Sequence, residues 1–372
     1  MFSRKADPEP ATPERVLLAF DGAADAPLRD DLSAVTRVGD DLWLASDEGA
    51  ALERLSRGPG GAFDRHASFP IARFLRLPEP GGEVDVEGLD ESDGWLWLVG
   101  SHSARRRQPD DDGSAGKRMR RLAKVDASPN RHLLARIPLV RTADGSWEPT
   151  DEASDDAAPG GVRQAGLLRV GRRRSALTRA VRDDEHLAPF LGLPGKDNGF
   201  NVEGMAVAGD RVFLGLRGPV LRGYAMVLEL RVRADGDDPS RLRLARIGRR
   251  GRRYRKHFLD LRGLGVRELC LDGDDLLILA GPTMTLDGRA TVFRWRGALS
   301  ADGDGIVGRD ELQVALELPY GLGDDEGVEH PEGMALAQTE DGRKAVLVVY
   351  DAPHARRRHG DAAVEADLFP LE

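Results

Sequence analysis

The sequence repeats one pattern five times: a short apolar strand, a polar turn, and a second apolar strand. The copies span residues 32–49, 86–103, 202–219, 266–283 and 331–352. Two apolar strands around a short polar turn are typical of a β-hairpin. A unit that recurs in this way buries its apolar face mainly against its neighbours, so the repeat decides the architecture of the whole chain.

We predict an all-β fold, a β-propeller in which each copy supplies the inner strands of one blade. The chain has 372 residues with 44 Gly and 22 Pro, which suits many short strands joined by tight turns. Five blades are favoured. Six blades are the alternative, because the interval between the second and third copies is about twice as long as the others and has room for one more.

That long interval is expected to contain an insertion, residues 142–198. Part of it has apolar residues at helix-like spacing, so a helical insertion around 162–191 is predicted. The residues that carry this spacing are Leu167, Val170, Leu177 and Val181.

Residues 15–372 are expected to form a single propeller domain behind a flexible N-terminal tail, residues 1–14, which is charged and contains several prolines. Residues 16–20 (VLLAF) are a strand candidate at the start of that domain. In ring-shaped folds such a strand often completes the last blade, which joins the two ends of the chain.

Composition excludes several classes of partner. Lys and Arg total 54 against 63 Asp and Glu, so the net charge is −9 and nucleic acid is not an expected partner. Cys270 is the single cysteine, which rules out a disulfide framework and a cysteine zinc site. The sequence contains no run of 18 apolar residues and no secretion signal, so we expect no membrane association and a cytoplasmic location.

The repeat also predicts where a site lies. In an antiparallel hairpin the start of the first strand and the end of the second share one edge, so residues at these places become neighbours. If the hairpins close into a ring, both sets surround one mouth of the central channel. The strand starts contribute Ser33, Glu87, Glu203, Arg267 and Glu332, and the strand exits contribute Asp47, Ser101, His102, Arg217 and Asp351.

Three glutamates at one channel mouth repel one another unless a cation, a proton or an arginine offsets their charge. One interpretation is a structural ionic belt in which Arg267 and Arg217 balance the glutamates. A second is a pocket for a small polar molecule. A third is a hard cation such as calcium held by Glu87, Glu203 and Glu332.

Two further signals concern catalysis and metal binding. His102 follows a strand exit directly and is the best candidate for a general acid or base, the alternative being a locally hydrogen-bonded loop histidine. Residues 300–312 place Asp302, Asp304 and Glu311 at positions three, five and twelve of a calcium-loop template. A plain polar hairpin loop is favoured there, because Ser300 replaces the leading Asp.

Four segments carry a resemblance to a known family: VEGLDESDGWLWLVGSHS, GFNVEGMAVAGDRVFLGLRGPVLRGYAMVLEL, YRKHFLDLRGLGVREL and DDLLILAGPTMTLDG. Over roughly residues 16–352 the sequence resembles the bacterial proteins grouped as domain of unknown function 3616. The resemblance implies a family that spans the whole chain and has no assigned reaction.

The Glu-Gly-Leu and Glu-Gly-Met openings of three repeats are similar, more distantly, to those of two other groups. These are the calcium-dependent propeller lactonases of the gluconolactonase group and the esterase-like, phytase-associated propellers. In the lactonases a glutamate at such an opening is a metal ligand, which the resemblance would place at Glu87, Glu203 or Glu332.

We therefore predict a propeller that binds a small polar ligand at its channel mouth. A calcium-dependent hydrolase of lactones, esters or phosphoesters is one alternative. A scaffold that binds a protein partner through Arg-rich loops such as residues 249–253 is another.

Overall fold

The computed structural model describes residues 12–21, 28–109, 113–155, 161–171, 174–284, 286–322, 327 and 329–371. Most of the predicted tail lies outside these residues. The described chain is all-β, and its α-helices are short: α1 (Ala115–Leu122) and α2 (Ala176–Ala180). Among the helices of these residues, none is long and apolar enough to cross a membrane.

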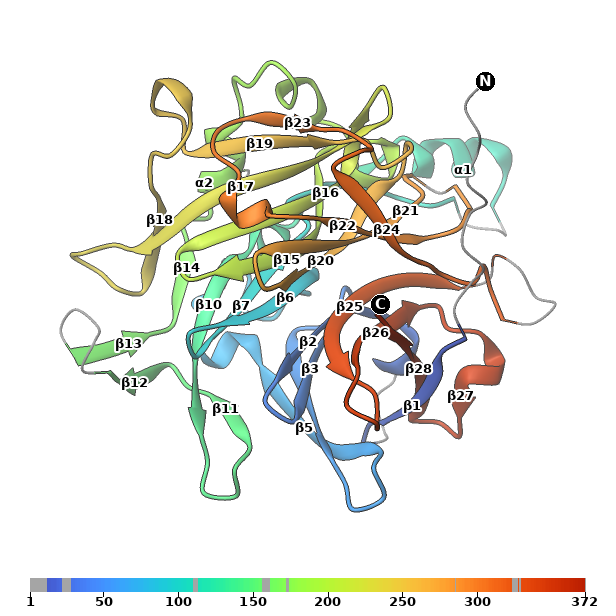
Figure 1. Cartoon of the computed structure of the whole chain (residues 1–372). Coiled ribbons are helices and arrows are strands. Elements are labelled where there is room, and N and C mark those ends of the chain that lie inside the picture. The colour runs from blue at the N-terminus through green and yellow to red at the C-terminus, as the bar shows by residue number, and fades with distance from the viewer. Residues whose placement is uncertain are drawn as a thin grey trace.

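Each of the five sequence repeats forms an antiparallel hairpin. The hairpins are β2 (Leu32–Val38) with β3 (Asp41–Ser46), β6 (Val86–Ser92) with β7 (Trp95–Gly100), β15 (Asn201–Ala208) with β16 (Arg211–Leu221), β20 (Gly265–Asp272) with β21 (Asp275–Gly281), and β25 (His330–Gln338) with β26 (Lys344–Asp351). The first strands contact one another in a cycle, β2 to β6, β15, β20, β25 and back to β2, and they gather near the middle of Figure 1. The arrangement is propeller-like.

Further strands extend each hairpin outward. They are β4 (Ala51–Arg57) and β5 (Phe63–Pro70); β10 (Leu134–Arg141), β11 (Trp147–Pro149) and β14 (Gly166–Leu168); β17 (Tyr224–Ala234), β18 (Arg241–Leu244), β19 (Tyr254–Leu259) and β23 (Gly305–Val307); β22 (Thr291–Trp295) and β24 (Leu312–Glu317); and β27 (Arg358–His359) and β28 (Ala363–Pro370). Two small separate sheets are formed by β8 (Arg105–Arg106) with β9 (Val125–Asp126) and by β12 (Glu152–Ser154) with β13 (Val162–Gln164).

The two ends of the chain meet in one sheet. The first strand, β1 (Glu14–Ala19), pairs antiparallel with β28 from Glu14↔Leu368 to Ala19↔Ala363, and β28 pairs with β26. Figure 1 shows β1 and β28 side by side. The expectation that residues 16–20 form a strand of the last unit is confirmed.

A buried ionic network lies beside this closure. The guanidinium of Arg357 donates to both oxygens of Asp367, at 2.8 and 2.9 Å, and to Glu329 Oε2 at 2.9 Å. The Tyr350 hydroxyl donates to Asp367 at 2.6 Å, and Arg15 of β1 lies 3.0 Å from the same carboxylate. Because each buried charge has an opposite partner, the network avoids most of the cost of an isolated buried ion.

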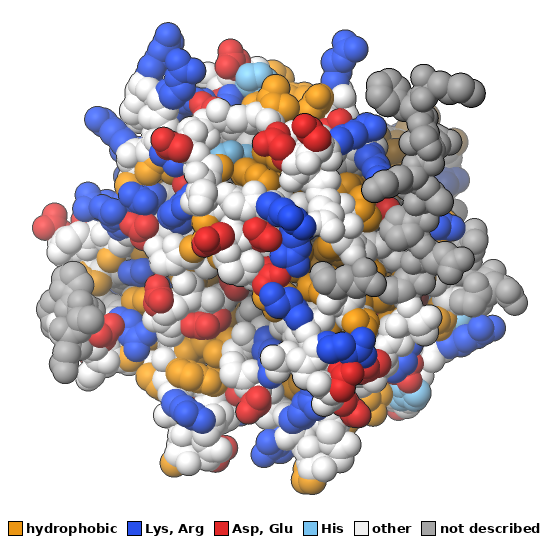
Figure 2. All heavy atoms as spheres, in the orientation of Figure 1, with side chains coloured by type: hydrophobic (Ala, Val, Ile, Leu, Met, Phe, Trp, Pro, Cys, Tyr) orange, Lys and Arg blue, Asp and Glu red, His pale blue; other side chains and the backbone are white. Residues whose placement is uncertain are grey.

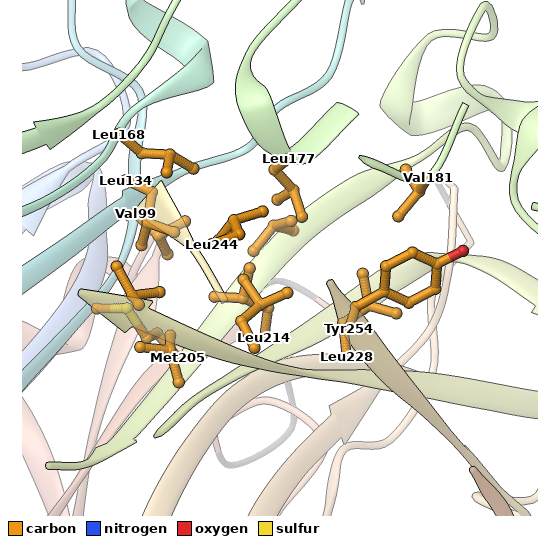
Figure 3. Packing of buried hydrophobic residues seen from close by; sticks show 14 of the residues in the cluster. Val99, Leu134, Leu168, Leu177, Val181, Met205, Leu214, Leu228, Leu244 and Tyr254 are labelled. Carbon is orange, nitrogen blue, oxygen red and sulfur yellow. The ribbon is translucent and has the colours of Figure 1, made fainter. Parts of the chain in front are cut away.

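The apolar core lies between neighbouring repeats. Figure 3 shows one such layer, in which Val99 and Leu134 of β7 and β10 pack with Met205, Leu214 and Leu228 of β15, β16 and β17. In the same view the ring of Tyr254 joins the layer while its hydroxyl points away from the carbons, and it donates to Asp184 at 2.6 Å.

The predicted helical insertion around 162–191 is wrong for most of its length. Residues 162–168 form β13 and β14, where Leu167 pairs with Ala135 of β10 and with Arg241 of β18. The remaining helical spacing belongs to the single short helix α2 and its exit, where Leu177 and Val181 are buried in the layer of Figure 3. The pairing of these residues with neighbouring strands therefore outweighed the helix-like spacing of their apolar residues.

The mixture of charges on the visible surface agrees with the similar numbers of basic and acidic residues in the sequence. Figure 2 shows Lys and Arg interspersed with Asp and Glu over the visible face, without a continuous basic surface on that side. Such mixing of signs is typical of a solvated protein surface and gives no reason to expect binding to a polyanion on this face.

Candidate ligand-binding cavity

Each of the five residues aligned by the repeat lies at a β-bulge. The pairing of each first strand with its partner skips one residue, and the skipped residues are Ser33, Glu87, Glu203, Arg267 and Glu332. A bulge places one extra residue in a strand and changes the direction of its side chain. Five equivalent bulges thus present five side chains at the same level of the ring.

A glycine follows the bulge in three of these strands, because the next inner strand comes very close there. A Cβ on Gly204 would lie 2.8 Å from the Glu268 backbone of β20. A Cβ on Gly333 would lie 3.1 Å from the Val35 nitrogen of β2, and one on Gly88 would lie 3.0 Å from Met205 of β15. The Glu-Gly pair therefore combines a side chain presented by a bulge with a close contact between neighbouring units.

A cavity of about 380 Å³ lies at this level. Six of the predicted ligand-binding residues line it: Asp47, Glu87, Glu203, Arg217, Glu332 and Asp351. Ser33, Ser101, His102 and Arg267 do not line it; the first two and Arg267 are buried beside it. Ser33 donates its hydroxyl to the Val86 carbonyl of β6 at 2.6 Å, which ties two first strands together.

One side of the cavity is an ion-pair cluster. Arg217 Nη1 donates to Glu203 Oε1 at 2.8 Å, and Arg267 Nη1 donates to Glu203 Oε2 at 3.2 Å and to Glu332 Oε1 at 2.6 Å. Asn201 also donates to Glu203, at 2.8 Å. Burial alone would raise the pKa of Glu203, but Arg217 and Arg267 more than offset it and lower that pKa. This side matches the ionic belt considered from the sequence.

The other side is acidic and lacks such partners. Glu87 is buried and makes no hydrogen bond or ion pair with the described residues, although it borders the cavity. Burial, together with the nearby charge of Asp85, raises its pKa well above the usual range. Burial and the neighbouring carboxylates also raise the pKa values of Asp47 and Asp351 to about 7.

His102 faces a different part of the molecule. Its Nδ1 lies 3.1 Å from Ser175 Oγ and its Nε2 lies 3.0 Å from the Leu133 carbonyl. Burial lowers its pKa to about 3, and the adjacent His132 adds to the effect. The imidazole is therefore neutral and has both nitrogens occupied, and the structure places it in a second hollow lined by His132 and Thr178, away from the carboxylates.

The metal hypotheses find no supporting geometry. Within the described residues no three His, Cys, Asp or Glu side chains are grouped so as to hold one metal ion. Of the three glutamates, Glu203 and Glu332 are both bound by Arg267, which supplies the positive charge that a cation would bring.

The calcium-loop residues also have other partners. Asp302 pairs with Arg255 at 2.9 Å, Asp304 pairs with Arg252, and Glu311 accepts from the Gly308 amide at 2.9 Å. Strand β23 runs through the middle of this segment and pairs with β19, so the three carboxylates do not converge. The pair between Arg252 and Asp304 also involves one arginine of the basic run 249–253.

Sequence reasoning missed three cavity residues that the repeat itself marks. Asp31, Asp85 and Asn201 line the cavity, and each lies two residues before a bulge. Residues two apart in a strand share a face, so the same alignment that found the bulge positions contained this second set. Lys196, by contrast, lines the cavity from the 3₁₀ turn Gly195–Asp197, which has no counterpart in the other repeats.

The fold and cavity together define an all-β, propeller-like protein with a polar pocket at the level of its first strands. A family model described as "Protein of unknown function (DUF3616)" matches residues 31–367. The chain therefore belongs to that family, which confirms the resemblance seen in the sequence. No curated protein matches the sequence.

Solved structures with a similar outline have little sequence in common with this chain. A streptogramin B lyase matches with a TM-score of 0.34 and 10% identity, over 96% of this chain and 98% of the other. The Pseudomonas aeruginosa periplasmic gluconolactonase PpgL matches with 0.34 and 15%, over 86% and 65%. A PQQ-bound aldose sugar dehydrogenase from Streptomyces coelicolor matches with 0.31 and 13%, over 96% and 99%. No functional argument rests on likeness at this level.

Proposed function

We propose that this protein is a five-bladed propeller that binds a small polar ligand in its central cavity, through Glu87, Asp47 and Asp351 on one side and Arg217 on the other. The cycle of contacts among the five first strands supports five blades. The long interval between the second and third repeats contributes outer strands and covering segments, which leaves no first strand over for a sixth blade among the described residues.

One observation carries the binding proposal: Glu87 is buried, has no partner among the described residues, and borders a cavity of about 380 Å³. Because this carboxyl group borders the cavity and has no partner there, its oxygens are available for hydrogen bonds with a bound molecule. Cavities of this size, with a few convergent polar groups, are typical of small-molecule sites.

The rim supports a site with restricted entry. Arg106 of β8 donates to Asp197 at 2.7 Å and to the Leu122 carbonyl of α1 at 2.9 Å, and the Gly195 amide donates to the Ala104 carbonyl at 3.0 Å. These bonds fasten two segments that border the cavity. These segments would partly shield the polar contacts of a bound molecule from water, which strengthens those contacts.

The test is a thermal-shift and ligand-observed NMR screen of small polar compounds (amines, polyols, sugars and carboxylic acids) against the full chain. Hits are repeated with Ala104→Trp, which places an indole at the cavity border, and with Ala72→Trp at an exposed position outside it. We expect binding to be lost in the first variant and retained in the second. Binding that survives Ala104→Trp unchanged would place the ligand elsewhere, and conversion of a hit to product would replace the binding function by an enzymatic one.

A further inference from the structure

The ion pairs around the cavity leave an excess of negative charge. The arginines that line the cavity each have a carboxylate partner: the pairs are Arg105–Glu48, Arg106–Asp197, Arg107–Asp126, Arg131–Asp85 and Arg217–Glu203. Among the described lining residues, the carboxyl groups of Asp31, Asp47, Glu87 and Asp351 have no ion pair, against the single unpaired amine of Lys196. The lining is therefore short of positive charge.

Glu87 lies where this excess of unpaired carboxyl groups can bind a ligand. Its bulge presents the side chain at the centre of the ring, where it is buried and without a partner in the described part of the chain. Asp47 directly follows β3, Asp351 is the last residue of β26, and both border the same cavity. An organic cation in this cavity would supply positive charge near Glu87, Asp47 and Asp351.

The chemistry of the lining selects among cations. Carboxylate oxygens accept hydrogen bonds, so they recognise N–H groups with direction as well as charge. Quaternary ammonium groups lack N–H donors and are usually held by aromatic cages. No Phe, Tyr, Trp or His is among the described residues that line this cavity. An amine or guanidinium therefore fits, and a quaternary ammonium does not.

We propose that the ligand of this cavity is a small organic cation with N–H donors, a primary amine or a guanidinium, held by Glu87, Asp47 and Asp351. This inference rests on the proposed function, since it names the class of ligand for the same cavity.

Binding of such a cation has a second signature besides affinity. The pKa values of Asp47 and Asp351 are raised to about 7, so near neutral pH each of these groups is partly protonated. An ammonium group favours the ionised form of both. Binding at pH 7 is therefore expected to release protons from these two groups and from Glu87, whose pKa is also raised, whereas a neutral ligand would release few.

The experiment is isothermal titration calorimetry on the full chain with matched probes. The probes are 1,4-diaminobutane, its neutral counterpart 1,4-butanediol, tetramethylammonium and calcium chloride. We expect the diamine to bind at least about tenfold more tightly than the diol, and tetramethylammonium to give no measurable heat of binding. Repeating the diamine titration at pH 7 in two buffers of different ionisation enthalpy measures the released protons.

Two variants connect the affinity to the named carboxyl groups. Glu87→Gln keeps the shape of the side chain but removes the carboxyl group that a bound cation would ionise, and because that group has no partner in the described residues its loss does not endanger folding. It is expected to weaken diamine binding at least about tenfold. Glu152→Gln, at an exposed position of β12, is the matched control and should leave binding unchanged.

The outcomes separate this inference from the proposed function. A diol that binds as tightly as the diamine, with both lost in Ala104→Trp, would overturn the cationic ligand and leave the cavity as a binding site. Binding of calcium alone, or of tetramethylammonium as tightly as the diamine, would also overturn it. If no probe binds, the cationic inference fails, and the compound screen above decides the proposed function by itself.

Discussion

Arg267 Nη1 lies 2.6 Å from Glu332 Oε1, and this contact joins the first strands of two neighbouring repeats, β20 and β25. Both residues occupy bulges at the same level of the ring. The same nitrogen also reaches Glu203 of β15, so one arginine bridges three repeats. Three of the five bulge residues thus form ion pairs and Ser33 donates to backbone carbonyls, whereas Glu87 faces the cavity without a partner in the described residues.

Replacing Arg267 by Met should destabilise the protein by about 3 kcal/mol. The substitution leaves Glu332 without its partner and removes one of the two arginines on Glu203, and breaking one side of a buried pair costs about 3 to 5 kcal/mol. Urea unfolding followed by tryptophan fluorescence measures the loss. The double variant Arg267→Met with Glu332→Gln should recover part of it, whereas strictly additive losses would show that the two side chains do not interact.

The repeat alone was enough to predict that several charged residues far apart in the chain would meet. Glu203 and Glu332 are far apart in the chain, yet they share Arg267 because hairpins of equal pattern place equal positions at one level of the ring. The alternation of residue types along each strand, together with the polar turns, determined the alignment of the five repeats. The bulge was not predictable in the same way, because it depends on pairing across the hairpin and leaves no mark in one strand's pattern.

The covering segments could not be predicted from the repeat. Helix α1 lies outside the five repeats, and Lys196 comes from a turn without a repeat counterpart. The placement of His102 was missed for a similar reason: its backbone has a φ of 54°, and its ring is directed by contacts with Ser175 and Leu133, which are distant in sequence. Tertiary contacts of this kind decide side-chain direction after the strand ends.

Gly204→Ala should destabilise the protein by about 2 kcal/mol or more. A Cβ at this position would lie 2.8 Å from the backbone of Glu268, and a strand backbone in the centre of the ring cannot move aside cheaply. The matched control is Gly236→Ala, where nothing lies within 4 Å of the added carbon. Thermal unfolding of both variants is the measurement. Equal melting temperatures would mean that the first strands are less closely packed than the structure shows.

Asp47→Asn should stabilise the unliganded protein, and the gain should depend on pH. The pKa of Asp47 is raised from 3.8 to about 7, chiefly by burial and by the charge of Asp85. The folded state therefore holds a proton that the unfolded state has lost between pH 4 and 7, and stability falls as pH rises through this range. The asparagine of the variant does not titrate, so this loss of stability with rising pH is absent.

The difference in unfolding free energy between Asp47→Asn and wild type should thus be small at pH 4 and grow to about 1 kcal/mol or more at pH 8. Urea titrations at several pH values give the curve. Asp237→Asn, at an exposed loop position, is the control and should show no such trend. A gain that is constant from pH 4 to pH 8 would contradict a raised pKa at Asp47.

The carboxyl group of Glu268, next to the bulge at Arg267, accepts hydrogen bonds from two backbone amides, and this role can be tested. Its Oε1 accepts hydrogen bonds from the Met205 amide of β15 at 3.0 Å and from the Leu269 amide at 2.9 Å. Burial raises its pKa well above the usual range, which favours the uncharged form. An uncharged side chain of the same shape should therefore serve equally well.

Glu268→Gln is expected to keep the unfolding free energy within about 1 kcal/mol of wild type near neutral pH, since the amide oxygen still accepts both bonds. Glu268→Ala should lose about 2 kcal/mol or more, because the Met205 amide is left buried without an acceptor and a cavity opens. Hydrogen exchange at Met205 separates the cases: it should stay slow in the Gln variant and become faster in the Ala variant. Equal losses in the two variants would show that the negative charge, and not the acceptor oxygen, is what β15 requires.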